Sequence, residues 1–144
     1  MITDKLLRVS DAQALTTTAN STDIIDLSVA RDIGEGDDLY AVFTVGTAFA
    51  GGTSVSAAVT IADNAALSTN PATIGMTGTV VTASLTAGAQ FVTRLGPRVG
   101  SNGQRYLGVI YTISGTYTAG TITCDIVTDI QDGKKFYASG FTVA

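Results

Sequence analysis

The chain consists of short runs in which apolar residues recur at every second position. Each run ends at glycine or at small polar residues. The clearest run is Leu39–Thr47, in which Leu39, Ala41, Phe43 and Val45 share one face, and Tyr40, Val42 and Thr44 share the other. A period of two places successive side chains on opposite faces of a sheet. Thr, Val, Ile, Tyr and Phe, which recur throughout these runs, favour strands. The sequence therefore predicts an all-β protein.

Turn residues, namely Gly, Asn-Ser and Pro, separate about eight to ten strands at roughly ten-residue spacing. This spacing favours a β-sandwich or a barrel in a single domain. The expected strands are Ala14–Thr18, Asp23–Leu27, Leu39–Thr47, Val55–Ile61, Thr79–Leu85, Gln90–Leu95, Arg105–Ser114, Thr121–Ile130 and Lys135–Val143. Ser10–Gln13 is interpreted as a turn that enters a strand, and Ala62–Asn70 as a loop or a single helical turn. We expect an N-terminal arm over residues 1–9 and the β domain over residues 10–144.

The residue content excludes several classes of function. The chain has no histidine and one cysteine, so Ser-His-Asp and Cys-His catalysis, histidine zinc sites and an internal disulfide cannot be built within it. It carries 8 basic against 12 acidic residues, with a sequence pI near 4.4, which argues against a nucleic-acid partner. We expect no enzymatic activity, no cofactor and no metal.

Membrane association is not expected either. No apolar run approaches the roughly 20 residues that span a bilayer, and Met1–Arg8 lacks the apolar region of a secretory signal. An outer-membrane barrel is the alternative for such strands, but the scattered aromatic residues do not supply its two aromatic girdles. The chain is expected to be soluble and made in a cytosol.

Two groups of charged residues are candidates for contact with a partner protein. The acidic loop Arg31–Asp38 contains Asp32, Glu35, Asp37 and Asp38, whose carboxylates could also surround a cation. Its spacing does not match the twelve-residue calcium loop, so solvent exposure or partner contact is the stronger interpretation. The second group is Arg94, Arg98 and Arg105, the one basic concentration, whose guanidinium groups could pair with acidic groups of a partner or be scattered surface charge.

Three further sets of residues have side chains that could carry chemistry. Asp125 and Asp129 could share a strand face and serve a carboxylate-based hydrolase, but outward-facing charges that suppress edge pairing explain them better. Cys124 lies between Ile122 and Ile126 on one face, which is typical of a buried, inert thiol. Five tyrosines could form sugar-stacking platforms, although buried or strand-pairing positions fit them better: Tyr40, Tyr106, Tyr111, Tyr117 and Tyr137.

Several segments, taken in their order along the chain, carry a family resemblance. They are Met1–Leu7, Ser10–Leu15, Asp26-Leu27, Arg31–Gly36, Leu85–Ala89, Gly96-Pro97, Arg105–Leu107, Tyr111–Gly115, Thr118–Thr121 and Tyr137–Phe141. In this order the chain resembles the jelly-roll capsid cement protein family typified by a Bordetella phage. The resemblance implies a jelly-roll-like β-sandwich that decorates the outside of an icosahedral capsid and clamps neighbouring major capsid protein subunits.

Further expectations follow from that resemblance. The chain would be a homo-oligomer, dimer or trimer, on the outer capsid surface of a virion, made in the cytoplasm of the host bacterium. The family offers no catalytic residues to assign. The N-terminal arm could lie on a neighbouring molecule or be a frayed terminus. The alternative function is a carbohydrate-binding or host-adhesion β-sandwich of a phage tail or surface fibre.

Overall fold

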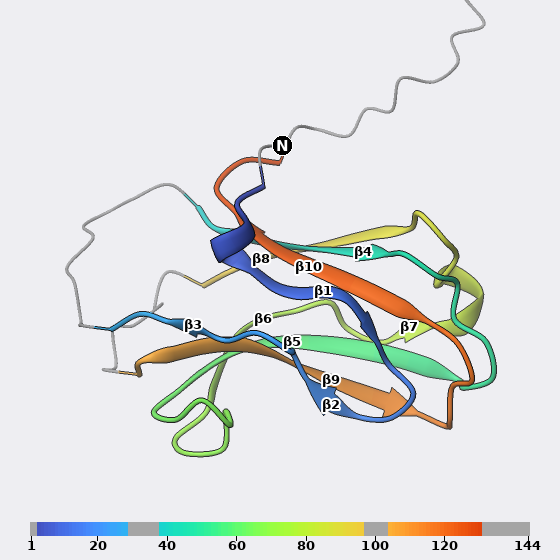
Figure 1. Cartoon of the computed structure of the whole chain (residues 1–144), viewed down its shortest axis with the longest axis horizontal. Helices are drawn as coiled ribbons and strands as arrows, with labels where there is room; N and C mark the ends of the chain where they lie inside the picture. Colours follow the sequence, from blue (N-terminus) through green and yellow to red (C-terminus); the bar gives the residue numbers. More distant parts are fainter. Residues whose placement is uncertain (1–2, 29–37, 97–103, 131–144) are drawn as a thin grey trace, which may run out of the picture.

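Two antiparallel sheets pack face to face in the computed structural model, which describes residues 3–28, 38–96 and 104–130 (Figure 1). The first sheet has the order β1 (Arg8–Ala14), β10 (Thr121–Val127), β4 (Tyr40–Val45), β8 (Gln90–Arg94). The second has the order β2 (Ala19–Asn20), β9 (Tyr106–Ser114), β5 (Ser54–Ala62), β6 (Ala72–Met76), with β3 (Ile25–Asp26) paired to β9 and β7 (Val80–Val81) paired to β5. The predicted all-β sandwich is confirmed.

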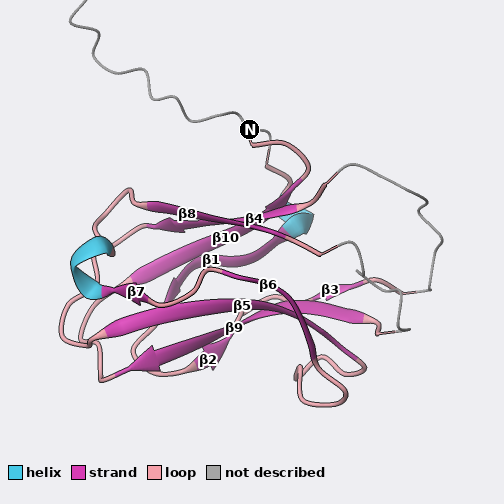
Figure 2. Ribbon diagram, turned by 180° about the vertical axis from the view of Figure 1, so that it is seen from behind, coloured by secondary structure: helices cyan, strands magenta, loops and turns pink. Residues whose placement is uncertain are grey.

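The strand order is that of a jelly roll. β2 and β3 pair with successive parts of β9, and β6 and β7 pair with successive parts of β5, so each of these two pairs occupies one strand position. Counted in this way, the sheets have the orders 1-8-3-6 and 2-7-4-5, the arrangement produced when a long antiparallel ribbon is rolled into two sheets. Figure 2 shows the two layers from behind, with the short 3-10 helix η2 (Thr82–Ser84) at one end.

The core lies between the sheets and is built by the alternation seen in the sequence. Ala41, Phe43 and Val45 of β4 are buried together with the apolar face of β5, as the period of two predicts. The rings of Phe43 and Tyr111, from opposite sheets, meet edge to face with centroids 6.3 Å apart. The stretch 63–70 covers the outer face of the second sheet, where buried Leu67 lies next to Gly108.

The beginning of the chain differs from the prediction. The turn expected at Ser10–Gln13 and the strand expected at Ala14–Thr18 are wrong, because β1 covers Arg8–Ala14. Two register shifts and a positive φ of 45° at Ala12 interrupt the alternation, which hides this strand in the sequence. Arg8 and Val9, the last residues of the expected arm, belong to β1, and the short 3-10 helix η1 (Lys5–Leu7) precedes them.

The region between β5 and β8 also differs. The expected strand Thr79–Leu85 is reduced to the two residues of β7, followed by η2. β6 was not predicted at all, because Gly75 breaks its apolar pattern. Gly75 allows a close approach of the sheets: a Cβ at this position would lie 3.0 Å from the carbonyl oxygen of Arg94.

Hydrogen bonds connect the two sheets along both long sides. On the β6–β8 side, the Gly96 amide donates to the Ile74 carbonyl at 2.7 Å. On the β1–β2 side, the buried hydroxyls of Ser10 and Tyr111 lie 2.8 Å apart, and Ser10 donates to Gln13 Oε1 at 2.8 Å. Gln13 in turn donates to the Asn20 carbonyl at 2.8 Å. Among the described residues no helix has the length and apolar character needed to cross a membrane.

Candidate interaction surfaces

Two of the predicted partner-binding arginines are already paired within the chain. Arg94, at the end of β8, donates to Asp38 at 2.5 Å, and Arg105, just before β9, holds both carboxylate oxygens of Asp26 at 2.7 and 2.8 Å. Both pairs lie where β3 and β8 end and β4 and β9 begin, at the left of Figure 1. The predicted residues Asp32, Glu35, Asp37 and Arg98 lie outside the described residues.

The geometry of these pairs fixes their charge states. Hydrogen bonds from the Arg105 guanidinium, which contributes most, and from the Ser28 backbone amide lower the pKa of Asp26 to about 2. Arg105 also lies over the Tyr106 ring, 5.3 Å from its centroid. Asp38 raises the pKa of Arg94. All four charges of the two pairs are exposed, so the pairs add little to stability, but they already occupy the two guanidinium groups.

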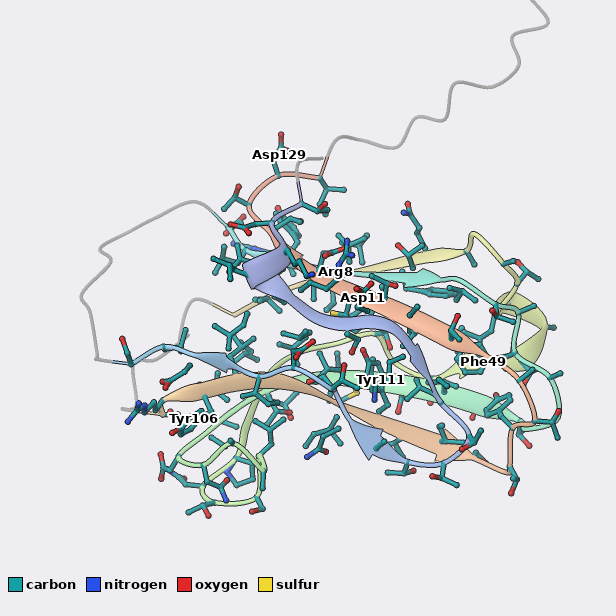
Figure 3. All side chains as sticks on the ribbon, in the orientation of Figure 1. Arg8, Asp11, Phe49, Tyr106, Tyr111 and Asp129 are labelled. Atoms are coloured by element: carbon teal, nitrogen blue, oxygen red, sulfur yellow. The ribbon has the colours of Figure 1, made fainter. Side chains whose placement is uncertain are left out.

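The structure corrects the interpretation of Asp125. It was expected to face outward and suppress edge pairing, but it is buried in β10, which lies between β1 and β4. Its carboxylate accepts from Arg8 Nε at 2.8 Å, and Arg8 also reaches the exposed Asp11 at 3.1 Å. β10 ends at Val127, so Asp129 lies beyond the strand on which both carboxylates were expected to share a face (Figure 3).

The tyrosines and the cysteine have distinct environments. Tyr111 and Tyr117 are buried, which leaves Tyr40 and Tyr106 as the partly exposed tyrosines among those described; Tyr137 lies outside the described residues. Cys124 is fully buried, as predicted, and burial raises the pKa of its thiol. The described residues contain no group of three or more acidic, histidine or cysteine side chains that could hold a metal ion.

A second surface, which was not predicted from the sequence, lies at the opposite end of the sandwich. Four loops meet there, residues 15–18, 46–53, 82–89 and 115–120, and we call this surface the neutral end because none of these residues is charged. Figure 3 places Phe49 within it. The signal was present in the sequence as long stretches without charge, such as 39–62, 64–93 and 106–124. It becomes a surface only when the fold brings their turns together.

Hydrogen bonds between loops hold the neutral end together. Phe49 and Ala50 donate from their backbone amides to Leu85 and Ala119, both at 3.0 Å. The Thr82 hydroxyl lies 2.7 Å from the Tyr117 hydroxyl. Beneath the loops, the rings of Phe49 and Tyr117 meet edge to face with centroids 5.0 Å apart, and both residues are buried. The loops are therefore packed on an aromatic pair of their own.

The described residues form a jelly-roll domain with paired charges at one end and an uncharged set of loops at the other. The family model Bbp16 matches residues 9–126, which run from β1 to within β10. The chain therefore belongs to the Bbp16 family, a Bordetella phage protein family. This confirms the resemblance to a phage protein family drawn from the sequence. No curated protein matches the chain.

Proposed function

We propose that this protein is a capsid cement protein of a tailed phage. It binds the outer surface of the icosahedral capsid as a homo-oligomer, dimer or trimer, and stabilises contacts between major capsid protein subunits, without enzymatic activity. The observation that carries the proposal is the Bbp16 match, which covers nearly all of the jelly roll. A protein of this kind acts from the virion, after synthesis in the cytoplasm of the host bacterium.

The physical properties of the domain fit such a role. Both long sides of the sandwich are linked by hydrogen bonds, and the loops of the neutral end are packed, so little conformational entropy remains to be lost on docking. Many copies on one shell, each with a modest interface, multiply their effect because neighbouring sites raise the effective concentration.

A binding assay with expanded capsids that lack the protein tests this proposal. The purified chain is expected to co-sediment with the shells and to raise their melting temperature. Bovine serum albumin at the same concentration serves as the control for trapping in the pellet. If the chain stays in the supernatant and the shells melt at an unchanged temperature, the cement role is wrong.

A further inference from the structure

Charge is separated along the long axis of the sandwich. The described residues include four basic side chains, Lys5, Arg8, Arg94 and Arg105. They also include eight acidic side chains, which are Asp4, Asp11, Asp23, Asp26, Asp38, Asp63, Asp125 and Asp129. None of these charged residues lies in the four loops of the neutral end. Ten of them lie in η1, at the first or last residue of a strand, or within two residues of a strand end, and these positions are away from those loops. We call the end with Asp26, Asp38, Arg94, Arg105 and Asp129 the charged end.

The arginines that the structure describes offer little to the acidic groups of a partner. Arg8, Arg94 and Arg105 are each held by a carboxylate of this chain within 2.8 Å, so a partner's carboxylate would have to displace an existing one. Acidic groups outnumber basic ones two to one among the described residues, so an acidic partner would also be repelled.

The neutral end has the opposite properties. Its exposed positions are Thr, Ala, Ser and Gly, together with half-exposed Val81 next to η2, and covering them removes no charge from water. Contacts between loops already fix its shape: Thr47 donates from its amide to Thr121 Oγ1 at 2.8 Å, and Thr118 from its amide to the Ala50 carbonyl at 2.8 Å. Binding here would cost little ordering of loops and little desolvation.

We infer that the neutral end is the surface that docks on the capsid, against an uncharged patch of the major capsid protein. This inference rests on the proposed function. The complementary surface must itself lack unpaired charges, because a charge buried against the neutral end would find no opposite charge to pair with. The charged end then faces away from the shell, where its charges stay in water. Pairing of two neutral ends with each other would instead bury this surface and remove it from the shell.

Substitutions of both signs at exposed neutral-end positions test the inference. Thr86 and Thr116 are exposed, and their side chains take part in no hydrogen bond among the described residues. T86E/T116E and T86K/T116K are each expected to weaken shell binding at least about 10-fold, because either sign buries unpaired charge. The matched control K5E/D129K changes two exposed charges at the other end and is expected to bind within about 2-fold of wild type.

Salt and self-association give independent readouts. Wild-type affinity is expected to change less than about 3-fold between 50 and 500 mM NaCl, because no ion pair forms at the interface. All variants are compared with wild type by circular dichroism and melting temperature, so that a folding defect is recognised. Co-sedimentation measures shell binding, and sedimentation equilibrium measures the oligomeric state of the free protein.

The outcomes separate the two proposals. If wild-type protein does not bind shells, the proposed function fails and this inference fails with it. If wild type binds but the neutral-end variants bind equally well, the docking surface is wrong while the cement role stands. If one sign of charge strengthens binding, the inferred uncharged patch on the major capsid protein is wrong. Loss of self-association in the neutral-end variants, with shell binding unchanged, would assign this surface to a second copy of the chain and overturn the inference.

Discussion

Arg8 is the side chain that connects the first strand to the middle of its sheet. Its guanidinium lies between the exposed Asp11 and the buried Asp125, whose side chain is only 8% exposed. A carboxylate in that position needs its cation, since burial of an unpaired charge is costly. The pair therefore serves chain organisation rather than the edge protection or catalysis considered from the sequence.

The mutation R8M is expected to destabilise the protein by about 3 kcal/mol, because it leaves the Asp125 carboxylate buried without its partner. Urea unfolding followed by circular dichroism measures the change. D11N removes only the exposed contact of Arg8 and should cost less than about 0.5 kcal/mol. Equal effects of the two mutations would show that Asp125 does not depend on Arg8.

The Asp26–Arg105 pair predicts a pH dependence. The pKa of Asp26 is lowered from 3.8 to about 2, so its ionised form is favoured in the folded protein. The stabilisation is complete above about pH 4 and is lost as the pH falls through the folded pKa near 2. The melting temperature of wild type should therefore slightly exceed that of D26N at pH 6, and the difference should vanish toward pH 2. A difference that stays constant over this range would contradict the assignment.

At the scale of elements, the loops of the neutral end depend on glycines placed against aromatic rings. Gly52 lies so close to Tyr117 that a Cβ would be 2.6 Å from the ring. Gly120 has a φ of 144°, and its missing side chain leaves room for Phe49. At both positions the backbone of a loop lies directly against an aromatic ring, so these glycines determine how the neutral end packs.

G120A is expected to cost about 3 kcal/mol, because it adds overpacking against Phe49 to an unfavourable φ. G78A provides the matched control: Gly78 also has a positive φ, 71°, but no atom lies within 4 Å of the Cβ position. That mutation should cost only about 1 kcal/mol. Thermal unfolding of both variants measures the difference, and similar losses would rule out the packing contribution at Gly120.

The elements also show where sequence reasoning succeeds. β4, β5 and β9 are long and strongly patterned, so their existence followed from the period of two. β1 escaped because its bulges break the alternation, and β6 because Gly75 serves an inter-sheet contact that no local pattern encodes. The burial of Asp125 and the neutral end likewise depend on pairing between distant segments, such as β1 with β10.

At the scale of the whole molecule, the two sheets form one unit because they share a core and are linked on both sides. Tyr111 contributes to both: its ring packs on Phe43 of the opposite sheet, and its hydroxyl reaches Ser10. The jelly-roll order requires that β1 pairs with β10, the first and the last of the strands that the structure describes. Local unfolding of either sheet would expose the shared core, so we expect cooperative behaviour.

Y111F is expected to lower stability by about 1 kcal/mol, because it removes one buried hydrogen bond while Ser10 keeps its bond to Gln13. Calorimetry should still show a single unfolding transition in the variant and in wild type. Y106F changes a partly exposed ring and should leave the transition almost unchanged. Two resolved transitions in Y111F would mean that the sheets unfold separately.

The burial of Cys124 has a practical consequence. Its thiol lies in the hydrophobic core on β10, a strand between β1 and β4, and burial disfavours the thiolate that reacts with labelling reagents. Because the chain has no other cysteine, each modification event records the opening of that one strand. The rate at which the protein reacts with a thiol reagent therefore measures how often the jelly roll opens, both free in solution and bound to a shell.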